Sequence, residues 1–149
     1  MKKVMLLHGV NHNMFGKRDP KQYGTITLDE INKKVNDLAE ELGIEVTNFQ
    51  TNNEGEFIDK IHEAYLQGYD GVMLNAGAWT HYSHAIGDAL RILECPVIEL
   101  HMSNVHAREE FRHHSVISPI ASGIIVGLGS SVYTLGLRAF DDIFRGNSH

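Results

Sequence analysis

Cysteine is almost missing from the sequence, which has only Cys95 among its 149 residues. A single cysteine excludes an internal disulfide and a cysteine cage for a metal, and it gives no sign of an oxidising compartment. Cys95 stands directly before Pro96, with no base beside it in the sequence. We therefore expect it to be a small buried packing residue rather than a nucleophile.

Basic clusters and long apolar runs are also missing. The 13 Lys and Arg residues are scattered among 19 Asp and Glu residues, and the formal net charge is -6. This balance argues against a polyanionic partner, so we expect no binding of nucleic acid. The first apolar run covers only residues 4–7 before His8 and Gly9. We therefore expect no signal peptide or membrane span, and a cytoplasmic protein without a membrane partner.

What the sequence does contain is an alternation of short apolar runs and amphipathic segments. Strands are expected at residues 3–7, 44–49, 69–74, 96–101 and 122–127. Helices are expected at residues 27–42, 57–65 and 132–143, with a further one from near Thr80 to Leu93. The first helix is marked by a capping box formed by Thr27 and Glu30 and by Gly43 at its end.

Five such alternations without repeats or linkers predict an α/β fold. We expect a flavodoxin-like, doubly wound, five-stranded parallel sheet in three layers, built as a single domain from residues 1–149. Ligands of such folds bind at the carboxyl ends of the strands. Residues 8–24, 75–81, 101–112 and 127–131 follow four of the strands, and the first three of these segments are rich in polar side chains. The sequence therefore predicts one site at this edge.

The first of these segments is part of a long irregular stretch, residues 9–25, which is typical of a lid or binding loop. It carries Arg18 and Tyr23. A guanidinium close to a phenol favours the phenolate, so this pair can act as a base; a plain surface loop is the alternative interpretation.

Residues 99–115 have the densest titratable chemistry, with four histidines, three glutamates and two arginines. Glu99 and His101 are two positions apart at a strand end, so their side chains point to the same face. A carboxylate beside an imidazole fixes its tautomer and favours the protonated form, which makes His101 a candidate general acid. A satisfied structural pair is the alternative.

The sequence gives less support to a metal site or a phosphate-binding loop. The ten histidines include no HExxH motif, and a helix that would join His8 and His12 is not expected, so we expect no metal site. The loop at residues 127–131 could hold a phosphate, but it lacks the third glycine of a dinucleotide fingerprint and the lysine of a P-loop. A tight turn is the alternative reading. A receiver domain is excluded because His8 and Asn75 stand where that fold requires acidic residues.

Taken together, three segments resemble the type II 3-dehydroquinate dehydratases, the small dehydroquinases. The first, GVNHNMFGKRDPKQYG, is similar to the family's NGPNLNLLGxREPxxYG, and the second, NAGAWTH, to NPGAYTH. The third and longest, IELHMSNVHAREEFRHHS, resembles IEVHLSNIHAREEFRHHS and is followed by IVGLG. The resemblance runs nearly end to end.

The resemblance implies dehydration of 3-dehydroquinate to 3-dehydroshikimate by anti elimination through an enolate, without metal or cofactor. At the matching positions it makes Tyr23 the base, which takes a proton from C2, and Arg18 the residue that stabilises its phenolate. His101, oriented by Glu99, becomes the acid that protonates the C1 hydroxyl. Asn11 supports the enolate oxygen through a water.

The resemblance also implies substrate contacts and an assembly. The substrate contacts are Asn75, His81, Arg112 and the main chain of Met102 and Ser103, whose amides face the carboxylate. Asp88 matches a residue that the family supplies from a neighbouring subunit. The implied assembly is a homododecamer built from trimers, active in the shikimate pathway of aromatic amino acid biosynthesis or in quinate catabolism.

The chain departs from the family pattern at several positions around these motifs. They are His8, Val10, His12, Ala76, Trp79 and Gly87, where the family usually has Asn, Pro, Leu, Pro, Tyr and Arg. Two other functions therefore stay open. One is a divergent lyase or isomerase acting on another cyclic hydroxy acid, and the other is a non-catalytic flavodoxin-like module that binds an anion through residues 127–131.

Overall fold

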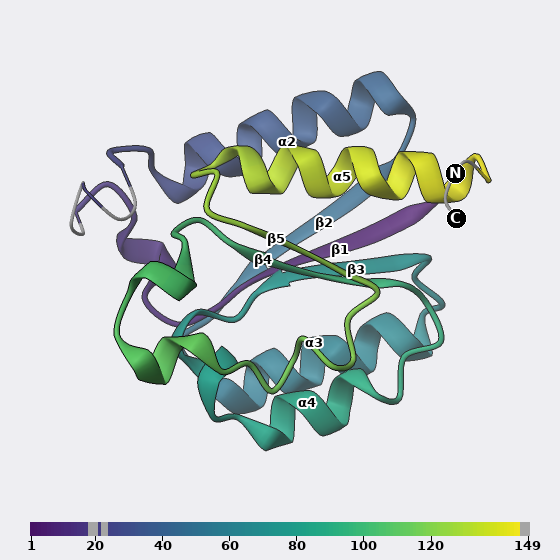
Figure 1. Cartoon of the computed structure of the whole chain (residues 1–149). Coiled ribbons are helices and arrows are strands. Elements are labelled where there is room, and N and C mark those ends of the chain that lie inside the picture. Colours follow the sequence, from purple (N-terminus) through teal and green to yellow (C-terminus); the bar gives the residue numbers. More distant parts are fainter. Residues whose placement is uncertain (18–20, 22–23, 147–149) are drawn as a thin grey trace.

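The computed structural model describes residues 1–17, 21 and 24–146 (Figure 1). Its centre is one sheet of five parallel strands in the order β2-β1-β3-β4-β5. The strands are β1 (Lys3–His8), β2 (Glu45–Gln50), β3 (Gly71–Asn75), β4 (Val97–His101) and β5 (Gly123–Val126). The predicted flavodoxin-like, five-stranded parallel sheet is confirmed.

Two helices cover each face of the sheet. Helices α2 (Leu28–Leu42) and α5 (Ser131–Phe144) lie on one face, and α3 (Glu54–Leu66) and α4 (His84–Leu90) lie on the other (Figure 1). Helix α2 begins with the predicted capping box, in which the Glu30 amide donates to Thr27 Oγ1 at 3.2 Å and the Thr27 amide to Glu30 Oε1 at 3.4 Å. It ends at Gly43, whose φ of 72° is the left-handed conformation that glycine adopts without strain.

The inner strand β1, between β2 and β3, contributes to both layers of the core. Val4 and Leu6 belong to the hydrophobic cluster under α2 and α5, whereas Met5 and Leu7 belong to the cluster under α3 and α4. All four side chains are completely buried. Since both faces of a doubly wound sheet are covered, its inner strands are continuously apolar and do not alternate with polar residues.

The start of α4 differs from the prediction. Thr80 lies in a 3-10 helix, η2 (Gly77–His81), and α4 begins only at His84, where the Ser83 hydroxyl accepts from the Ile86 amide at 3.1 Å. Helix α4 ends at Leu90, short of the predicted Leu93. The amides of Tyr82 and Ser83 both donate to the carbonyl of Trp79, which closes the first turn before the helix starts. The 3-10 turn places His81 at the sheet edge.

Short 3-10 helices also shape the remaining segments at this edge. They are η1 (His12–Met14), η3 (Val105–Ala107) and η4 (Glu110–His113). Cys95 lies at the opposite end of the molecule, next to β4, and is half-buried rather than buried. Among the helices in the described residues, none has the length and apolar character needed to cross a bilayer.

Candidate active site

A cavity of about 120 Å³ opens at the carboxyl ends of β1, β3 and β4. It is lined by Val10, Asn11, His12, Asn75, Gly77, Ala78, His81, His101, Met102, Ser103, Val105, Arg108 and Arg112. The three polar segments predicted to meet at this edge therefore do so. The fourth, residues 127–131, contributes to a neighbouring cavity that shares Met102 and Ser103.

Glu99 and His101 form a buried acid–base pair on β4. Nε2 of His101 lies 2.6 Å from Glu99 Oε2, and the two residues are only 6% and 1% exposed. Alternation along β4 brings both side chains to the same face, as predicted. An ionised carboxylate can only accept, so Nε2 carries the hydrogen and the tautomer of the ring is fixed.

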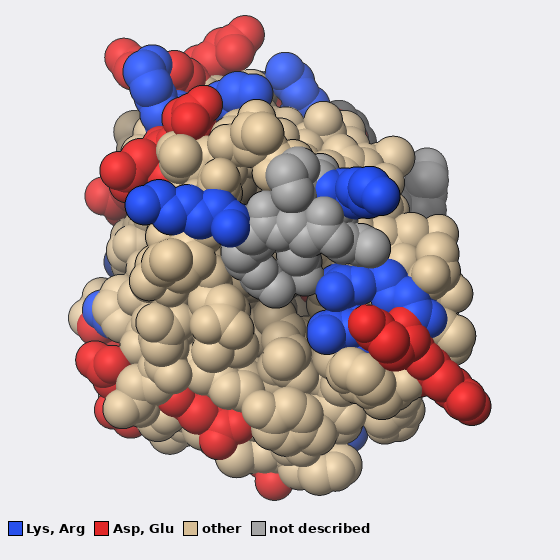
Figure 2. Space-filling view, turned by 90° about the vertical axis from the view of Figure 1, so that its left-hand side faces the viewer, with Lys and Arg blue, Asp and Glu red and all other residues tan. Residues whose placement is uncertain are grey.

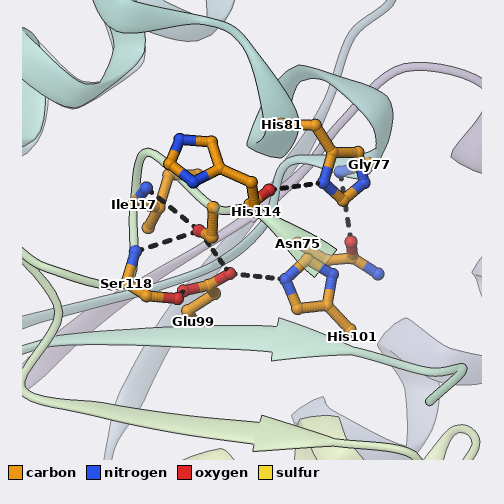
Figure 3. A network of polar contacts seen from close by, with 9 residues as sticks. Asn75, Gly77, His81, Glu99, His101, His114, Ile117 and Ser118 are labelled. Carbon is orange, nitrogen blue, oxygen red and sulfur yellow. Dashed lines mark hydrogen bonds and ion pairs between the residues drawn. The ribbon is translucent and has the colours of Figure 1, made fainter. Parts of the chain in front are cut away.

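Two serines complete the surroundings of the Glu99 carboxylate. Ser115 Oγ donates to Oε2 at 2.9 Å and Ser118 Oγ to Oε1 at 2.5 Å (Figure 3). Burial raises the pKa of the Glu99 carboxyl, but hydrogen bonds from His101, Ser118 and Ser115 and the charge of His101 lower the pKa below its usual value. Glu99 is therefore held as an anion in the protein interior.

Asn75, at the end of β3, has a fixed side-chain amide. Its Nδ2 donates to the hydroxyl of Tyr133 at 2.9 Å, and its Oδ1 accepts from the amide of Gly77 at 3.2 Å. Tyr133 lies on α5 and is completely buried, and burial raises the pKa of its phenol. A neutral tyrosine thus determines which way the Asn75 amide faces the cavity.

His81 is oriented by the segment that follows η4. Nδ1 lies 2.9 Å from the carbonyl of His114, and because a carbonyl can only accept, Nδ1 carries the hydrogen (Figure 3). Burial lowers the pKa of His81, and the charges of His101 and Arg112 lower it further, against the opposing effects of the His114 hydrogen bond and Glu99. A neutral His81 leaves Nε2 as a hydrogen-bond acceptor.

Two arginines give the cavity positive charge. Arg112 is held by Glu109, with Nε 2.6 Å from Oε2, and its guanidinium lies 4.7 Å from the ring centre of Phe111. Arg108 Nη1 donates to Ser103 Oγ at 3.2 Å. On the face of the molecule at the strand ends, Lys and Arg side chains flank the centre, and most Asp and Glu side chains lie towards the periphery (Figure 2).

The loop after β1 brings Asn11 and His12 to the site, and His8 ends the strand before it. Asn11 has a φ of 70°, and its amide donates to Asn52 Oδ1 at 2.8 Å. His12 Nδ1 accepts from the Gly9 amide at 3.0 Å, and the His12 ring lines the cavity beside Gly77. His8 is completely buried behind them, and its Nε2 lies 2.8 Å from Asn32 Oδ1.

The predicted site residues still to be placed are Arg18, Tyr23 and Asp88. Arg18 and Tyr23 lie outside the described residues. Asp88 is exposed on α4 and does not line the cavity. Within residues 1–17, 21 and 24–146, no three side chains of His, Cys, Asp or Glu are grouped as metal ligands would be.

Sequence reasoning missed four contributors to this site: Arg108, Ser115, Ser118 and Tyr133. Arg108 and Ser115 lie within the motif that led to Glu99 and His101, so proximity in sequence was a usable signal. Ser118 and Tyr133 are 19 and 58 positions from their partners Glu99 and Asn75. Only the folded chain brings these pairs together.

Comparison with known proteins places this geometry in one family. The profile of the family described as Dehydroquinase class II matches residues 2–141. The 3-dehydroquinate dehydratase of Syntrophotalea carbinolica is 58% identical over 97% of this chain and 98% of its own, and that of Leptothrix cholodnii is 59% identical over 91% of both chains.

Solved structures agree with this assignment. The type II dehydroquinase from Butyrivibrio crossotus superposes with a TM-score of 0.92 at 42% identity, covering 94% of this chain and 97% of that one. The chain belongs to the class II dehydroquinase family.

Proposed function

We propose that the protein dehydrates 3-dehydroquinate to 3-dehydroshikimate. The observation that carries the proposal is the buried Glu99–His101 pair beside a cavity that two arginines line. A general acid, an anion-binding wall and fixed polar groups are what the removal of a hydroxyl from a small acid requires. The names of the relatives support the same reaction.

His101 is the acid of the proposed reaction. With Nε2–H donating to Glu99, the second ring nitrogen, Nδ1, is left to carry the proton that the substrate takes. It passes that proton to the C1 hydroxyl, which leaves as water. The negative charge of Glu99 stabilises the imidazolium before the transfer.

Tyr23 is the proposed base, with Arg18 stabilising its phenolate. The phenolate takes the proton from C2, and the electrons of that bond form an enolate. When the enolate collapses, they become the C1–C2 double bond as the hydroxyl departs. Asn11 supports the enolate oxygen through a water. Anti elimination requires the base and the acid on opposite faces of the ring, in agreement with a base on a loop and an acid on a strand.

The remaining cavity groups bind the substrate in this proposal. Within the described part of the chain, the amides of Met102 and Ser103 donate to no carbonyl, so they are available to a substrate carboxylate. The guanidinium of Arg112 adds positive charge at the same wall. Asn75 and His81 offer oriented polar groups to the hydroxyls.

The alternative of an anion-binding module loses support from the loop at residues 127–131. The amides of Gly127 and Gly129 already donate to the carbonyls of His101 and Met102, at 3.1 and 3.0 Å. Glycine is required there because both residues have positive φ. The loop therefore holds the end of β4 in place, and this favours the interpretation of residues 127–131 as a tight turn.

The proposal extends to assembly and setting. We infer a homododecamer built from trimers, working without metal or cofactor in the cytoplasm. Biosynthetic and catabolic routes share this reaction, so the site chemistry serves either one. Asp88, exposed on α4, is the residue proposed to reach a neighbouring subunit.

Ultraviolet absorbance tests the reaction directly, since dehydration creates a conjugated enone. On mixing chelator-treated protein with 3-dehydroquinate, we expect the absorbance to rise at the same rate as without chelator. No rise from a folded sample would contradict the proposal. A panel of related cyclic hydroxy acids would then test the divergent lyase, because His12 lines the cavity where the family usually has leucine.

Substitution of the proposed acid or base should abolish most turnover. We expect Tyr23→Phe and His101→Ala each to lower kcat at least ~10²-fold, because each removes a proton-transfer group, while the thermal transition is kept. Tyr65→Phe and His62→Ala change exposed residues of the same types on α3, away from the cavity, and should have wild-type turnover. Turnover near wild type in Tyr23→Phe or His101→Ala would remove that residue from its role.

A further inference from the structure

The Glu99 carboxylate receives three donors from two distant parts of the chain. His101 and Ser115 donate to Oε2, and Ser118 alone donates to Oε1. Ser118 is thus the only described side chain that holds the second carboxylate oxygen (Figure 3). With both oxygens fixed, the carboxylate plane cannot rotate away from the imidazole.

Ser115 is itself locked in place. Its Oγ accepts from the amides of Ile117 and Ser118, both at 3.0 Å. Since these two bonds occupy the acceptor side of the oxygen, its hydrogen is directed to Glu99 at 2.9 Å. Ser115 therefore also stabilises the turn, whereas among the described residues the Ser118 hydroxyl bonds only to Glu99.

The same short segment also reaches the substrate-binding side of the cavity. The carbonyl of His114 accepts from His81 Nδ1, and the amide of Val116 donates to the carbonyl of Thr80 at 2.9 Å. Residues 114–118 therefore connect the acid pair on β4 to η2. A shift of this segment would move the Glu99–His101 pair relative to His81.

We propose that Ser118 is a positioning residue for the acid: its hydroxyl fixes Glu99 as an oriented carboxylate, so that the shared proton stays on His101. The inference rests on the proposed dehydration, in which His101 keeps the shared proton on Nε2 and delivers its other ring proton, from Nδ1, to the substrate. Ser118 acts through Glu99 and does not line the substrate cavity. It is therefore no catalytic residue itself.

Removal of the Ser118 hydroxyl should make the buried carboxylate more basic. Loss of one of three donors leaves the anion less stabilised, while its burial is unchanged. Once Glu99 is protonated, its Oε2 no longer holds His101 through a charged hydrogen bond from Nε2. The titratable and charged groups that surround Glu99 are His81, His101, His106, Arg112 and His113, and none of them is altered by the substitution.

The test begins with Ser118→Ala in the dehydration assay across pH. We expect kcat to fall about tenfold with KM nearly unchanged, and the acid limb of the kcat profile to move to higher pH. Ser118→Thr keeps the hydroxyl, so its kcat and the position of its acid limb should be those of wild type. Ser122→Ala is the matched control, because it also removes a serine hydroxyl bonded to β4, at Val97 on the far end of that strand, and should behave as wild type.

A double-mutant cycle separates action through Glu99 from a structural role. In the Glu99→Gln background, Ser118→Ala should cause no further loss of kcat. An equal loss in both backgrounds, or a lower kcat with an unmoved acid limb, would overturn the proposal. A kcat of Ser118→Thr as low as that of Ser118→Ala would also overturn the proposal.

Direct titration makes the inference independent of turnover. Carbon NMR of labelled glutamate should give a higher pKa for Glu99 in Ser118→Ala than in wild type, and an equal pKa would overturn the inference. If wild type does not dehydrate 3-dehydroquinate, the proposed function fails, and this titration still decides whether Ser118 controls the charge of Glu99.

Discussion

His8 is an imidazole enclosed in the protein at the end of β1. Desolvation lowers the pKa of His8 to about 4, although its hydrogen bond to Asn32 opposes this shift. Its Nδ1 is buried without a hydrogen-bond partner among the described residues. The folded protein therefore holds His8 neutral, whereas the unfolded chain protonates it near the ordinary value of about 6.5.

The His8 ring should make folding sensitive to acid. Because the pKa is lower in the folded state, the unfolded state binds more protons between the two values, so stability is full above about pH 6.5 and is lost as pH falls towards 4. Between pH 7 and pH 5 we expect this residue to account for about 2 kcal/mol of the decline. Denaturant unfolding at both pH values measures it.

Substitution of His8 tests this sign. His8→Gln keeps an amide that can donate to Asn32 and cannot titrate, so its unfolding free energy should fall less on acidification than that of wild type. His62→Gln, at an exposed position on α3, should decline like wild type. An identical pH dependence in His8→Gln and wild type would disprove the assignment.

At the scale of single elements, α2 depends on its first turn. The reciprocal bonds of Thr27 and Glu30 satisfy two amides that the helix cannot pair internally. We expect Thr27→Ala to lower the unfolding free energy by about 1 kcal/mol. Thr27→Ser keeps the hydroxyl and should lose far less in the same denaturant titration; equal losses would show that the cap contributes nothing.

Local signals explain which elements were predictable. The capping box and Gly43 delimit α2 in the sequence, and strand alternation was enough to pair Glu99 with His101. The start of α4 was not predictable, because Thr80 and Ser83 are both typical cap residues. The choice between them depends on two amides that share the carbonyl of Trp79, a bond pattern without a sequence signature.

The same reasoning explains what was missed in the site. Motifs reveal residues that are close in sequence, and they led to all three segments that line the cavity. Contacts such as Ser118 to Glu99 and Tyr133 to Asn75 depend on how layers of the fold pack, which no local pattern specifies. Roles for Arg18 and Tyr23 remain predictions from the resemblance, since they fall outside the described residues.

At the scale of the whole molecule, the proposed assembly makes a claim about Asp88. We expect Asp88→Ala to keep the stability of wild type within about 0.5 kcal/mol, because the side chain is exposed on α4. If Asp88 reaches a neighbour's cavity, KM should rise severalfold. Steady-state kinetics combined with light scattering of the assembly measures both effects.

A control and a contrary result complete this prediction. Asp59→Ala removes an exposed carboxylate from α3 and should keep wild-type KM and mass. If Asp88→Ala also has the KM of wild type in the intact assembly, the intersubunit contact is wrong. A wild-type particle with the mass of one 16.7 kDa chain would contradict the dodecamer itself.

The direction of strand β1 has a practical consequence. Strand β1 starts at Lys3 and runs towards the cavity, and α5 runs back from the strand ends, so Lys3 and the end of α5 lie on the side opposite the active-site edge (Figure 1). A linker joined at Met1 would extend from the side opposite the cavity and would not obstruct the entry of substrate. Immobilisation on a solid support through that end would present the cavities outward, ready for a flow reactor.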